Sequence, residues 1–560
     1  MDRVLFLVPP HLKFEDFMNP GPRVRMVRKN NKNFGYVLTD MPLGPLSLSS
    51  YLKKHFNVET RILDFNVTLA RMPDFNYGSF TEFFHALLAS DEWREFNPTV
   101  VGITALFTPS YYNLLDLGRV NRELFPHSLI LSGGGVPTNM FREMFRDSTA
   151  FDALCFGEGE KPLLRLLQSL NRKAMLEQDG CWITRRKVEA GQVKQDFTQD
   201  FIFNLDEIPF YYDAVNTDDY SLNPALTSYS GVAKPKIANV HYMTSRGCPY
   251  CCTFCSSWTV NGKKMRYHSV ERVDTDFAKL VSEFGVEAIV FQDDNFMGDS
   301  GVDTTRQQQI LLLLKKYGLR AVFQNSLTLV KLKRPVLELM KDVGVDSLVL
   351  SVESGSDETL KLIKKPLRLE HSVQVARDCR ELGIYTDCNI LVGTPGETKK
   401  MIEDTRNFLP TIGANWFKVF ITTPIVGSEM YEFASANGYL VGDPVNFDYS
   451  KANIETKDWT REWLWDTMFS MQMELNFVYN SDMRLGDYQT ALIGLHNAIS
   501  GRYNHAFAHY YASICYEKLG EQDKAHYHLE QAREAAKDPH WRKWLDRYNL
   551  LMEESVPVGT

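Results

Sequence analysis

The sequence predicts an α/β protein in three parts: a doubly wound parallel sheet, an open (β/α)6 barrel and an all-α tail. Apolar and amphipathic segments alternate over residues 1–170, which indicates a parallel sheet with helices on both faces. A second alternating series over residues 236–450 has six strand-like runs, fewer than the eight of a closed barrel. Strand signals then stop, and residues 451–560 have helical periodicity.

The polar residues 171–235 separate the two alternating series and are predicted to form a linker. Within this linker, residues 181–193 have the pattern of a hairpin. At 560 residues, the chain is longer than one hydrophobic core usually supports, and its hydrophobic fraction of 44% is enough for several cores. We therefore expect separate domains on either side of the linker.

The bulk properties exclude several classes of protein. A net charge of −8 disfavours naked nucleic acid as the main partner, because phosphate binding needs a basic face. The apolar run at residues 4–8 is too short for a signal peptide or a membrane span, and no run near the required ~18 residues occurs elsewhere. The nine cysteines, four of them between 248 and 255, do not form a secreted disulfide pattern. These features predict a cytoplasmic protein without an integral membrane segment.

Two glycine-bearing turns follow predicted strands of the first sheet. Gly133, Gly134 and Gly135 follow one strand, and residues 157–160 follow the next. Ligands of doubly wound sheets bind at the carboxyl ends of the strands, so both turns are candidate binding loops. An ordinary tight turn is the alternative interpretation of each turn by itself.

The tail contains one internal similarity. Ala491, Leu495 and Ala498 recur 34 residues later as Ala525, Leu529 and Ala532. This period is similar to that of tetratricopeptide repeats, which often bind a protein partner. A plain helical bundle that packs against the barrel is the alternative.

The strongest chemical signal is a cysteine cluster directly after a predicted strand. Cys248, Cys252 and Cys255 lie at offsets of 0, 4 and 7 residues, so their thiolates can hold three irons of a cubane cluster. The fourth iron is then open for a substrate or cofactor. Structural zinc is the rival, but it requires four closed ligands and no second pair follows at a suitable spacing. Cys251 leaves open a second ligand choice, in which it replaces Cys252.

This cysteine spacing and three later segments together resemble the radical SAM (S-adenosylmethionine) superfamily. Residues 350–356, 392–398 and 423–428 follow predicted strands and are similar to the family's segments in the same order. The resemblance covers residues 235–440. It implies a 4Fe-4S cluster whose open iron binds SAM, and reductive cleavage of SAM to a 5′-deoxyadenosyl radical.

The resemblance also implies which residues contact SAM. The glycine-rich pair that many members have after the second strand is replaced here by residues 292–296, a form similar to members that carry a cobalamin-binding domain. A helix cap is the alternative role for Asp294. Because the cofactors carry the hard chemistry, no catalytic side chain is assigned. The predicted SAM contacts are Tyr250, Phe254, Gln292, Asp293, Asn295, Ser351, Glu353 and Gly393.

The first 170 residues resemble the flavodoxin-like, cobalamin-binding domain of class B radical SAM enzymes. The chain lacks the Asp-x-His-x-x-Gly motif of a cobalt ligand, and His11, His85 and His127 stand in other contexts. Many relatives of this class lack that ligand too, and a degenerate domain without cofactor is the alternative. The predicted cobalamin contacts are Leu43, Gly44, Thr104, Gly133, Gly134, Gly135, Gly157, Glu158, Gly159 and Glu160.

These resemblances imply a cobalamin-dependent radical SAM methyltransferase that acts on a carbon or phosphorus of a lipid, tetrapyrrole or secondary metabolite. Flavodoxin or ferredoxin would supply the electron. One alternative is a cyclase, oxidase or rearranging enzyme without methyl transfer, and a less favoured one is an assembly scaffold. A methylthiotransferase acting on tRNA would require further N-terminal cysteines, and none precedes Cys155.

Overall fold

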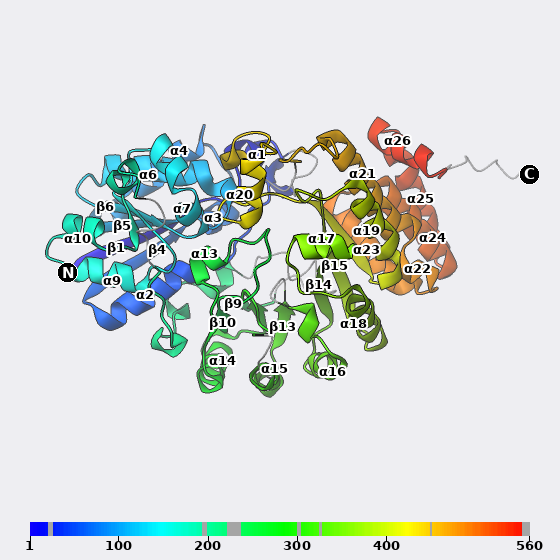
Figure 1. Ribbon diagram of the computed structural model, residues 1–560, viewed down its shortest axis with the longest axis horizontal. Coiled ribbons are helices and arrows are strands. Elements are labelled where there is room, and N and C mark those ends of the chain that lie inside the picture. The colour runs from blue at the N-terminus through cyan, green and yellow to red at the C-terminus, as the bar shows by residue number, and fades with distance from the viewer. Residues whose placement is uncertain are drawn as a thin grey trace, which may run out of the picture.

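The fold is described from a computed structural model of the chain. It describes residues 1–20, 26–192, 199–220, 237–299, 304–323, 327–447 and 451–550. Figure 1 shows the α/β domain of the N-terminal half at one end, the barrel in the middle and the C-terminal helices at the other end. None of the described helices is long and apolar enough to cross a membrane.

The N-terminal domain is a doubly wound sheet with the strand order β4-β1-β5-β6-β7-β8. The first five strands are parallel and follow the flavodoxin order, in which the second strand in sequence lies outside the first. Because helices cover both faces, Val4 to Val8 of β1 are all buried. The strands are β1 (Asp2–Val8), β4 (Val58–Asp64), β5 (Val100–Thr104), β6 (Leu129–Gly133), β7 (Ala153–Cys155) and β8 (Trp182–Ile183). Helices beside them include α2 (Leu43–His55), α6 (Tyr111–Leu124), α7 (Gly135–Asn139) and α9 (Glu160–Gln168).

The expected hairpin over residues 181–193 is wrong. β8 pairs antiparallel with β7 of the first sheet, and the chain then enters α11 (Arg185–Glu189). Thr184 caps this helix, since its side chain accepts a hydrogen bond from Lys187 N. The buried Lys187 ammonium donates to the carbonyls of Leu176 and Trp182, which fastens α11 to the sheet. The first sheet therefore extends beyond the expected boundary at residue 170.

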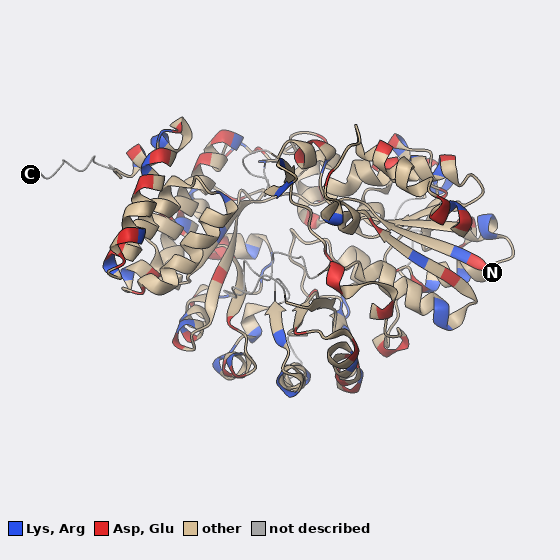
Figure 2. Cartoon of the chain, turned by 180° about the vertical axis from the view of Figure 1, so that it is seen from behind, with Lys and Arg blue, Asp and Glu red and all other residues tan. Residues whose placement is uncertain are grey.

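The barrel is open and consists of two three-stranded parallel sheets, ordered β13-β12-β9 and β14-β15-β16. Its strands are β9 (Asn239–Tyr242), β12 (Ala288–Phe291), β13 (Arg320–Phe323), β14 (Ser347–Glu353), β15 (Tyr385–Val392) and β16 (Trp416–Ile421). The helices on its outer side are α14 (Val270–Phe284), α15 (Thr305–Tyr317), α16 (Arg334–Asp342), α18 (Leu369–Glu381) and α19 (Lys399–Ile412). Figure 2 shows that charged residues of both signs lie on these helices, mostly away from the strands.

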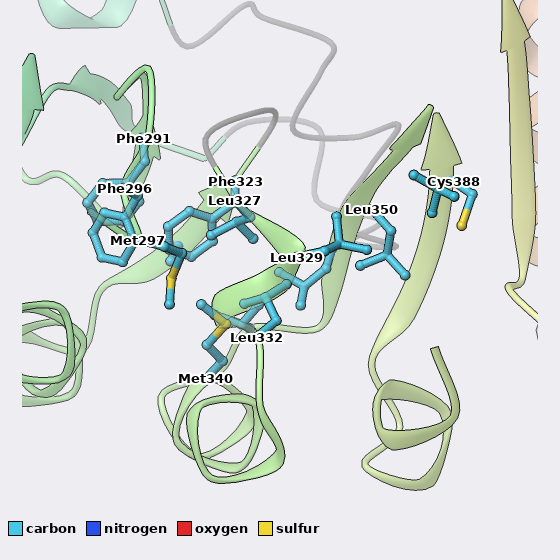
Figure 3. Close-up of a cluster of buried hydrophobic side chains, with 14 of the residues drawn as sticks. Phe291, Phe296, Met297, Phe323, Leu327, Leu329, Leu332, Met340, Leu350 and Cys388 are labelled. Carbon is cyan, nitrogen blue, oxygen red and sulfur yellow. The ribbon is translucent and has the colours of Figure 1, made fainter. Parts of the chain in front are cut away.

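Buried apolar side chains fill the space between the barrel strands and the outer helices. The rings of Phe291 and Phe323 stack at 4.8 Å between centroids, and Phe296 packs beside both (Figure 3). Leu350 on β14 and Cys388 on β15 continue the same layer. This core keeps the ends of neighbouring strands in a fixed relation, which the site requires.

The C-terminal helices protect the free edge of the barrel. Asn476, in a π-helical turn after α21 (Arg461–Met473), accepts a hydrogen bond from Phe417 N and donates one to Phe417 O, at 2.8 and 2.7 Å. Gln472 donates to Val419 O at 2.6 Å. These amides occupy backbone groups of edge strand β16 that would otherwise be open to pairing with another chain. After the short helix α22 (Ser481–Arg484) come α23 (Tyr488–Gly501), α24 (Ala506–Lys518), α25 (Gln522–Ala535) and α26 (Pro539–Arg547). The tetratricopeptide assignment stays a prediction.

Candidate active site

The cysteine loop begins at a tightly constrained glycine. Gly247 has φ +91°, and an added Cβ would lie 2.5 Å from Lys264 O, so a side chain at this position would force the loop open. Its N–H donates to the Asp294 carboxylate at 3.1 Å, and Cys248 N donates to Gly262 O at 3.3 Å. Before the loop, β10 (Ser245–Arg246) pairs with β11 (Arg266–Tyr267). The loop is therefore closed on itself and anchored at both ends.

Three of the four thiols lie close enough to affect one another electrostatically. Cys248, Cys252 and Cys255 are half-buried, whereas Cys251 is exposed. Burial raises the pKa of Cys248 to about 12, and the nearby thiols of Cys255 and Cys252 add to the shift. Burial likewise raises the pKa of Cys252 to about 11, with a further contribution from Cys255 and an opposing one from Lys365. This mutual proximity fits the ligand choice with offsets of 0, 4 and 7.

The donor set consists of three thiols on one loop, the kind of ligand that holds an iron-sulfur cubane. Within the described ranges, no group of three His, Cys, Asp or Glu side chains is arranged to hold a single metal ion. In a cubane, each thiolate binds a different iron, so the three ligands surround a larger space. Thiols such as those of Cys248 and Cys252, whose pKa burial raises, would lose their protons on coordination, as thiols do beside a metal cation.

Two of the predicted SAM contacts have their polar atoms engaged within the chain. Asp293 is buried and accepts hydrogen bonds from Thr244 Oγ1 at 2.7 Å and from Ser245 Oγ at 2.6 Å. Asn295 is also buried, donates to Gly298 O and accepts from Thr328 Oγ1, both at 2.8 Å. The structure therefore argues against SAM binding by these two side chains. Instead, Asp293 fixes the segment that leads into the cysteine loop, and Asn295 links its own turn to Thr328.

Asp294 has a role that the helix-cap alternative did not include. Its Oδ2 accepts hydrogen bonds from Gly247 N and from Asn261 Nδ2 at 2.9 Å, so it closes the base of the cysteine loop. Neighbouring Gln292 is half-buried, with its Nε2 3.3 Å from His241 Nδ1.

The end of β14 is irregular. The ladder to β15 shifts register between Ser351 and Glu353, and Glu353 has φ +67°, a costly conformation for a residue with a side chain. Its carboxylate pairs with the Lys365 ammonium at 3.0 Å. Lys365 is 15% exposed at its side chain, and its charge acts on Cys252. The sequence analysis missed Lys365, which stands between exposed Lys364 and Pro366 and has no distinguishing signal in the sequence.

The end of β15 is braced by a buried carboxylate. Gly393 has φ +81°, and an added Cβ would lie 2.3 Å from Leu464 of α21. Glu397 Oε2 accepts hydrogen bonds from Gly393 N at 2.8 Å and from Thr394 N at 3.1 Å. Burial raises the pKa of Glu397 to about 7. The two other predicted SAM contacts, Tyr250 and Phe254, are half-buried on the cysteine loop itself.

The first glycine turn of the N-terminal sheet is open. Thr104, Gly133, Gly134 and Gly135 are half-buried at the carboxyl ends of β5 and β6. Gly134 has φ +104°, and an added Cβ would lie 2.7 Å from Ala105 O. A bare backbone at this point lets a flat ligand approach closely.

Two apolar side chains beside this turn were missed by the sequence analysis. Leu106 and Phe107, directly after β5, are 59% and 50% exposed. His11 lies next to them, with its ring 6.4 Å from that of Phe107 and its Nδ1 3.2 Å from Ser110 Oγ. Two exposed apolar side chains together at the ligand edge of a doubly wound sheet fit the flat face of a corrin. The predicted contacts Leu43 and Gly44 lie at the start of α2, where Gly44 is exposed.

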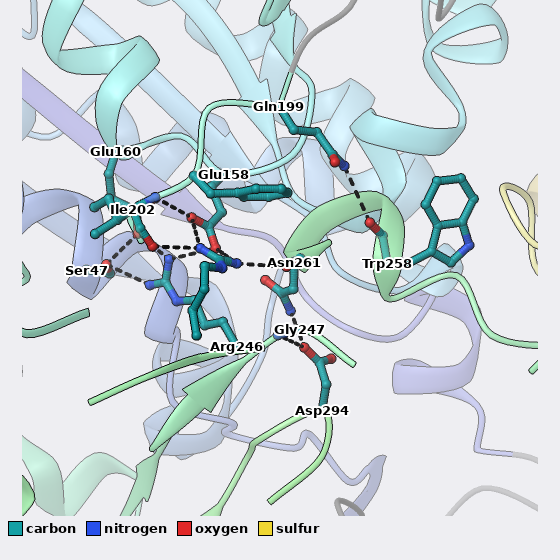
Figure 4. Close-up of polar contacts among 12 residues, drawn as sticks. Ser47, Glu158, Glu160, Gln199, Ile202, Arg246, Gly247, Trp258, Asn261 and Asp294 are labelled. Carbon is teal, nitrogen blue, oxygen red and sulfur yellow. Dashed lines mark hydrogen bonds and ion pairs between the residues drawn. The ribbon is translucent and has the colours of Figure 1, made fainter. Parts of the chain in front are cut away.

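The second glycine turn is occupied by the protein itself. Glu158 and Glu160 are buried, and both carboxylates pair with Arg246 of the barrel domain (Figure 4). Arg266 of the same domain pairs with Glu158. Arg266 binds Glu158 through both Nη atoms, at 2.7 and 2.8 Å. Arg246 Nη1 lies 2.9 Å from Glu160 and 3.2 Å from Glu158. The structure therefore argues against corrin contact by these two carboxylates.

Comparison with known proteins supports both halves of the site. The pattern of the Radical SAM superfamily matches residues 242–409, and that of the B12 binding domain matches residues 33–167. An uncharacterized methyltransferase of Pyrococcus horikoshii is 30% identical over 349 residues, which cover 62% of this chain and 72% of that relative. The chain belongs to the radical SAM superfamily. This radical SAM enzyme is cobalamin-dependent, and its cofactors are a 4Fe-4S cluster, SAM and cobalamin.

Two further similarities agree with this assignment. The cytidylyl-2-hydroxyethylphosphonate methyltransferase of Streptomyces wedmorensis is 27% identical over 373 residues, which cover 62% of this radical SAM enzyme and 68% of that relative. The solved structure of the radical enzyme OxsB with aqua-cobalamin bound has a TM-score of 0.61 at 14% identity, covering 99% of this chain and 82% of that one. This second similarity supports the fold.

The two halves of the radical SAM enzyme meet at the cysteine loop. Asn139 at the end of α7 donates to Thr259 Oγ1 at 3.0 Å, in the short helix α13 (Trp258–Asn261) that follows Cys255. An added Cβ at Gly157 would lie 3.6 Å from Val260 O in the same helix. The carboxyl edge of the N-terminal sheet therefore packs directly on the segment that carries the cluster ligands.

Proposed function

We propose that this enzyme transfers a methyl group to an unactivated carbon, or to a phosphorus, of a lipid, tetrapyrrole or secondary metabolite. The observation that carries the proposal is the contact between the ligand edge of the B12-binding domain and the cysteine loop, through Asn139 and Thr259. A methyl donor held at that edge would lie close to a radical generated at the loop. Methyltransferases among the relatives agree with this reaction class.

The described residues divide between the cofactors as follows. Cys248, Cys252 and Cys255 would hold the cluster. When bound, the cluster would supply an electron for SAM cleavage and cobalamin would supply the methyl group. Residues proposed to hold SAM are Tyr250, Phe254, Gln292, Ser351, Glu353, Gly393 and, in addition to the sequence-based set, Lys365. Residues proposed to hold cobalamin are Leu43, Gly44, Thr104, Leu106, Phe107, Gly133, Gly134 and Gly135.

The chain's own task is to position these groups and to exclude water. Lys365, paired with Glu353 and close to Cys252, places a positive charge where the SAM carboxylate would approach the open iron. Glu397 and Leu464 fix the backbone at Gly393 from behind. On the side of the N-terminal sheet, the apolar side chains Leu106 and Phe107 would exclude water once a corrin covers them.

The net reaction balances with two molecules of SAM and two external electrons. One SAM accepts an electron, takes a hydrogen from the substrate and leaves as methionine and 5′-deoxyadenosine. The other SAM gives its methyl group and leaves as S-adenosylhomocysteine. With the second electron, the substrate C–H bond is replaced by C–CH3 and no proton is left over.

The test is anaerobic reconstitution with iron, sulfide and hydroxocobalamin, followed by product analysis with methyl-labelled SAM and a strong reductant. We expect bound corrin, 5′-deoxyadenosine and S-adenosylhomocysteine. The matched variants are Cys252→Ala, which should abolish both nucleoside products, and Cys251→Ala, which should leave both unchanged because Cys251 is exposed. Production of 5′-deoxyadenosine without S-adenosylhomocysteine would overturn methyl transfer and favour a cyclase or rearranging enzyme.

We also propose that the enzyme works in the cytoplasm with a flavodoxin or ferredoxin as its electron donor. Radical SAM chemistry requires such an external donor. The C-terminal helices are proposed as a contact for a protein partner, on the strength of their tetratricopeptide-like period. Copurification of a protein partner with the full chain, and its loss when residues 488–550 are deleted, would test the contact through the C-terminal helices.

A further inference from the structure

A buried network of two carboxylates and two guanidinium groups joins the B12-binding domain to the barrel. Glu158 lies in the turn before α9, and Glu160 is the first residue of that helix. Arg246 belongs to β10 and Arg266 to β11, and the two strands pair. The side chains are 4% and 5% exposed for the glutamates, and 13% and 2% for the arginines. Four charges of balanced sign are therefore sealed into one interface.

Ser47 extends the network to a third element. Its hydroxyl donates to Glu160 Oε1 at 2.6 Å and accepts from Arg246 Nη2 at 3.0 Å. It lies in α2, one turn after Leu43 and Gly44, which are proposed to contact cobalamin. Arg246 thus touches α2, the turn before α9 and the start of α9 in the B12-binding domain.

Arg246 stands directly before the cluster loop. The next residue, Gly247, is held by Asp294, and Cys248 N donates to Gly262 O. Arg266 donates to Asn261 O at 2.7 Å, at the far end of the same loop. The two arginines therefore hold the loop at its two ends, Arg246 before Gly247 and Arg266 at Asn261, and both pair with Glu158.

We propose that Arg246 is a positioning residue which, with Glu158, Glu160 and Arg266, holds the cluster loop at a fixed place relative to the cobalamin loops. Arginine suits this task because its planar fork makes several directed bonds, whereas a lysine ammonium is a point charge. The consequence is that SAM cleavage and methyl transfer stay coupled, so that each cleavage leads to one methyl transfer. The positioning role deepens the proposed function, and one of its two readouts depends on that function.

The experiment compares Arg246→Lys and Glu160→Gln with wild type as the reconstituted holoenzyme. Arg246→Lys keeps the charge and loses the fork, and Glu160→Gln leaves Glu158 paired with both arginines. Ser47→Ala, which removes no charge, serves if either variant fails to fold. The matched control is Asp482→Asn, which breaks a buried ion pair with Arg380 between the barrel and the C-terminal helices, at 2.6 Å.

The first readout is amide hydrogen exchange in peptides that cover residues 247–262, measured without substrate. We expect exchange about tenfold faster in the two network variants than in wild type, and no change there in the control. The second readout is the ratio of 5′-deoxyadenosine to S-adenosylhomocysteine, which should rise severalfold in the network variants because cleavage becomes uncoupled from methyl transfer.

The proposal is overturned if the network variants and the control give the same exchange in residues 247–262. An unchanged product ratio in the presence of faster exchange also overturns it, because the loop's position would then have no effect on coupling. If wild type forms no S-adenosylhomocysteine, the proposed methyl transfer fails, and the exchange comparison still decides the positioning role.

Discussion

Two glycine turns lie at the same edge of the N-terminal sheet, and one is open whereas the other is covered by the barrel domain. The turn at residues 133–135 is half-buried and lies beside exposed Leu106 and Phe107, whereas the turn at residues 157–160 has both carboxylates buried against arginines. Both turns follow parallel strands and are similar in the sequence. The comparison teaches that the carboxyl end of a strand marks a contact surface. Either a cofactor or another domain of the same chain can cover that surface.

The largest effect on stability is expected when the occupied turn, residues 157–160, loses one of its arginine partners. Arg266→Met would leave Glu158 buried with one guanidinium fewer, and loss of one partner of a buried pair costs about 3–5 kcal/mol. We expect a loss of that size in the free energy of unfolding, measured with urea. Lys400→Met, in an exposed pair with Asp404, is the control and should change it by less than about 0.5 kcal/mol. A loss below about 1 kcal/mol for Arg266→Met would contradict the burial of this network.

A second test contrasts the paired Glu160 with Glu397, a buried carboxylate without a cationic partner among its hydrogen bonds. Burial raises the folded-state pKa of Glu397 to about 7, above its unfolded value of about 4.3. The folded chain therefore binds this proton more tightly, and stability falls as pH rises from about 4.3 through 7. Glu397→Gln should be more stable than wild type at pH 8 by about 3 kcal/mol, and equal to it near pH 4.5.

Thermal unfolding of the Glu397→Gln variant at both pH values checks this expectation. The glutamine keeps an acceptor for Gly393 N and Thr394 N, and its amide would donate to Thr359 Oγ1 in place of the present bond. Equal midpoints of variant and wild type at pH 8 would refute the raised pKa.

The open turn is tested by glycine substitution. Gly134→Ala places a Cβ 2.7 Å from Ala105 O at φ +104°, which disturbs the surface proposed for the corrin. We expect hydroxocobalamin binding to weaken by about tenfold or more, which equals ~1.4 kcal/mol, with unchanged iron content. Gly501→Ala at the end of α23 is the control, since its Cβ would meet nothing within 4 Å and the residue belongs to neither cofactor site. Equal corrin binding in the two variants would remove the case for this turn.

The smallest effect is a pH dependence at the occupied turn. Burial raises the pKa of Glu160, the Arg246 guanidinium lowers it, and the net shift is downward. A lowered pKa contributes stability above the unfolded value of about 4.3 and loses it as pH falls through the folded value. The stability difference between wild type and Glu160→Gln should therefore shrink between pH 5.5 and 3.5. A constant difference in urea titrations over this range would contradict the ion pair.

Much of the fold was predictable, because alternation of strand and helix is a local property. The doubly wound sheet, the open barrel and the helical tail agree with the sequence pattern. The hairpin at residues 181–193 failed because β8 joins β7 instead, while Thr184 starts a helix. Strand partners and caps of this kind depend on neighbours that periodicity does not contain.

The site divides in the same way. The thiols of Cys248, Cys252 and Cys255 were predicted together, since three ligands within eight residues need no tertiary information. Asp293 and Asn295 were predicted as SAM contacts, but both are engaged by their surroundings. Lys365 was missed because its partners, Glu353 and the cluster loop, lie on other segments.

The sequence by itself determined the order of the domains, the cluster-ligand spacing and the edge of the first sheet at which ligands gather. These follow from local periodicity and from short spacings along the chain. The tertiary structure alone decided which glycine turn stays open and which is filled. Glu158 meets Arg266 across 108 positions, and Ser47 meets Arg246 across 199. Buried charges must find partners wherever the fold brings them, so these roles are set by packing between domains.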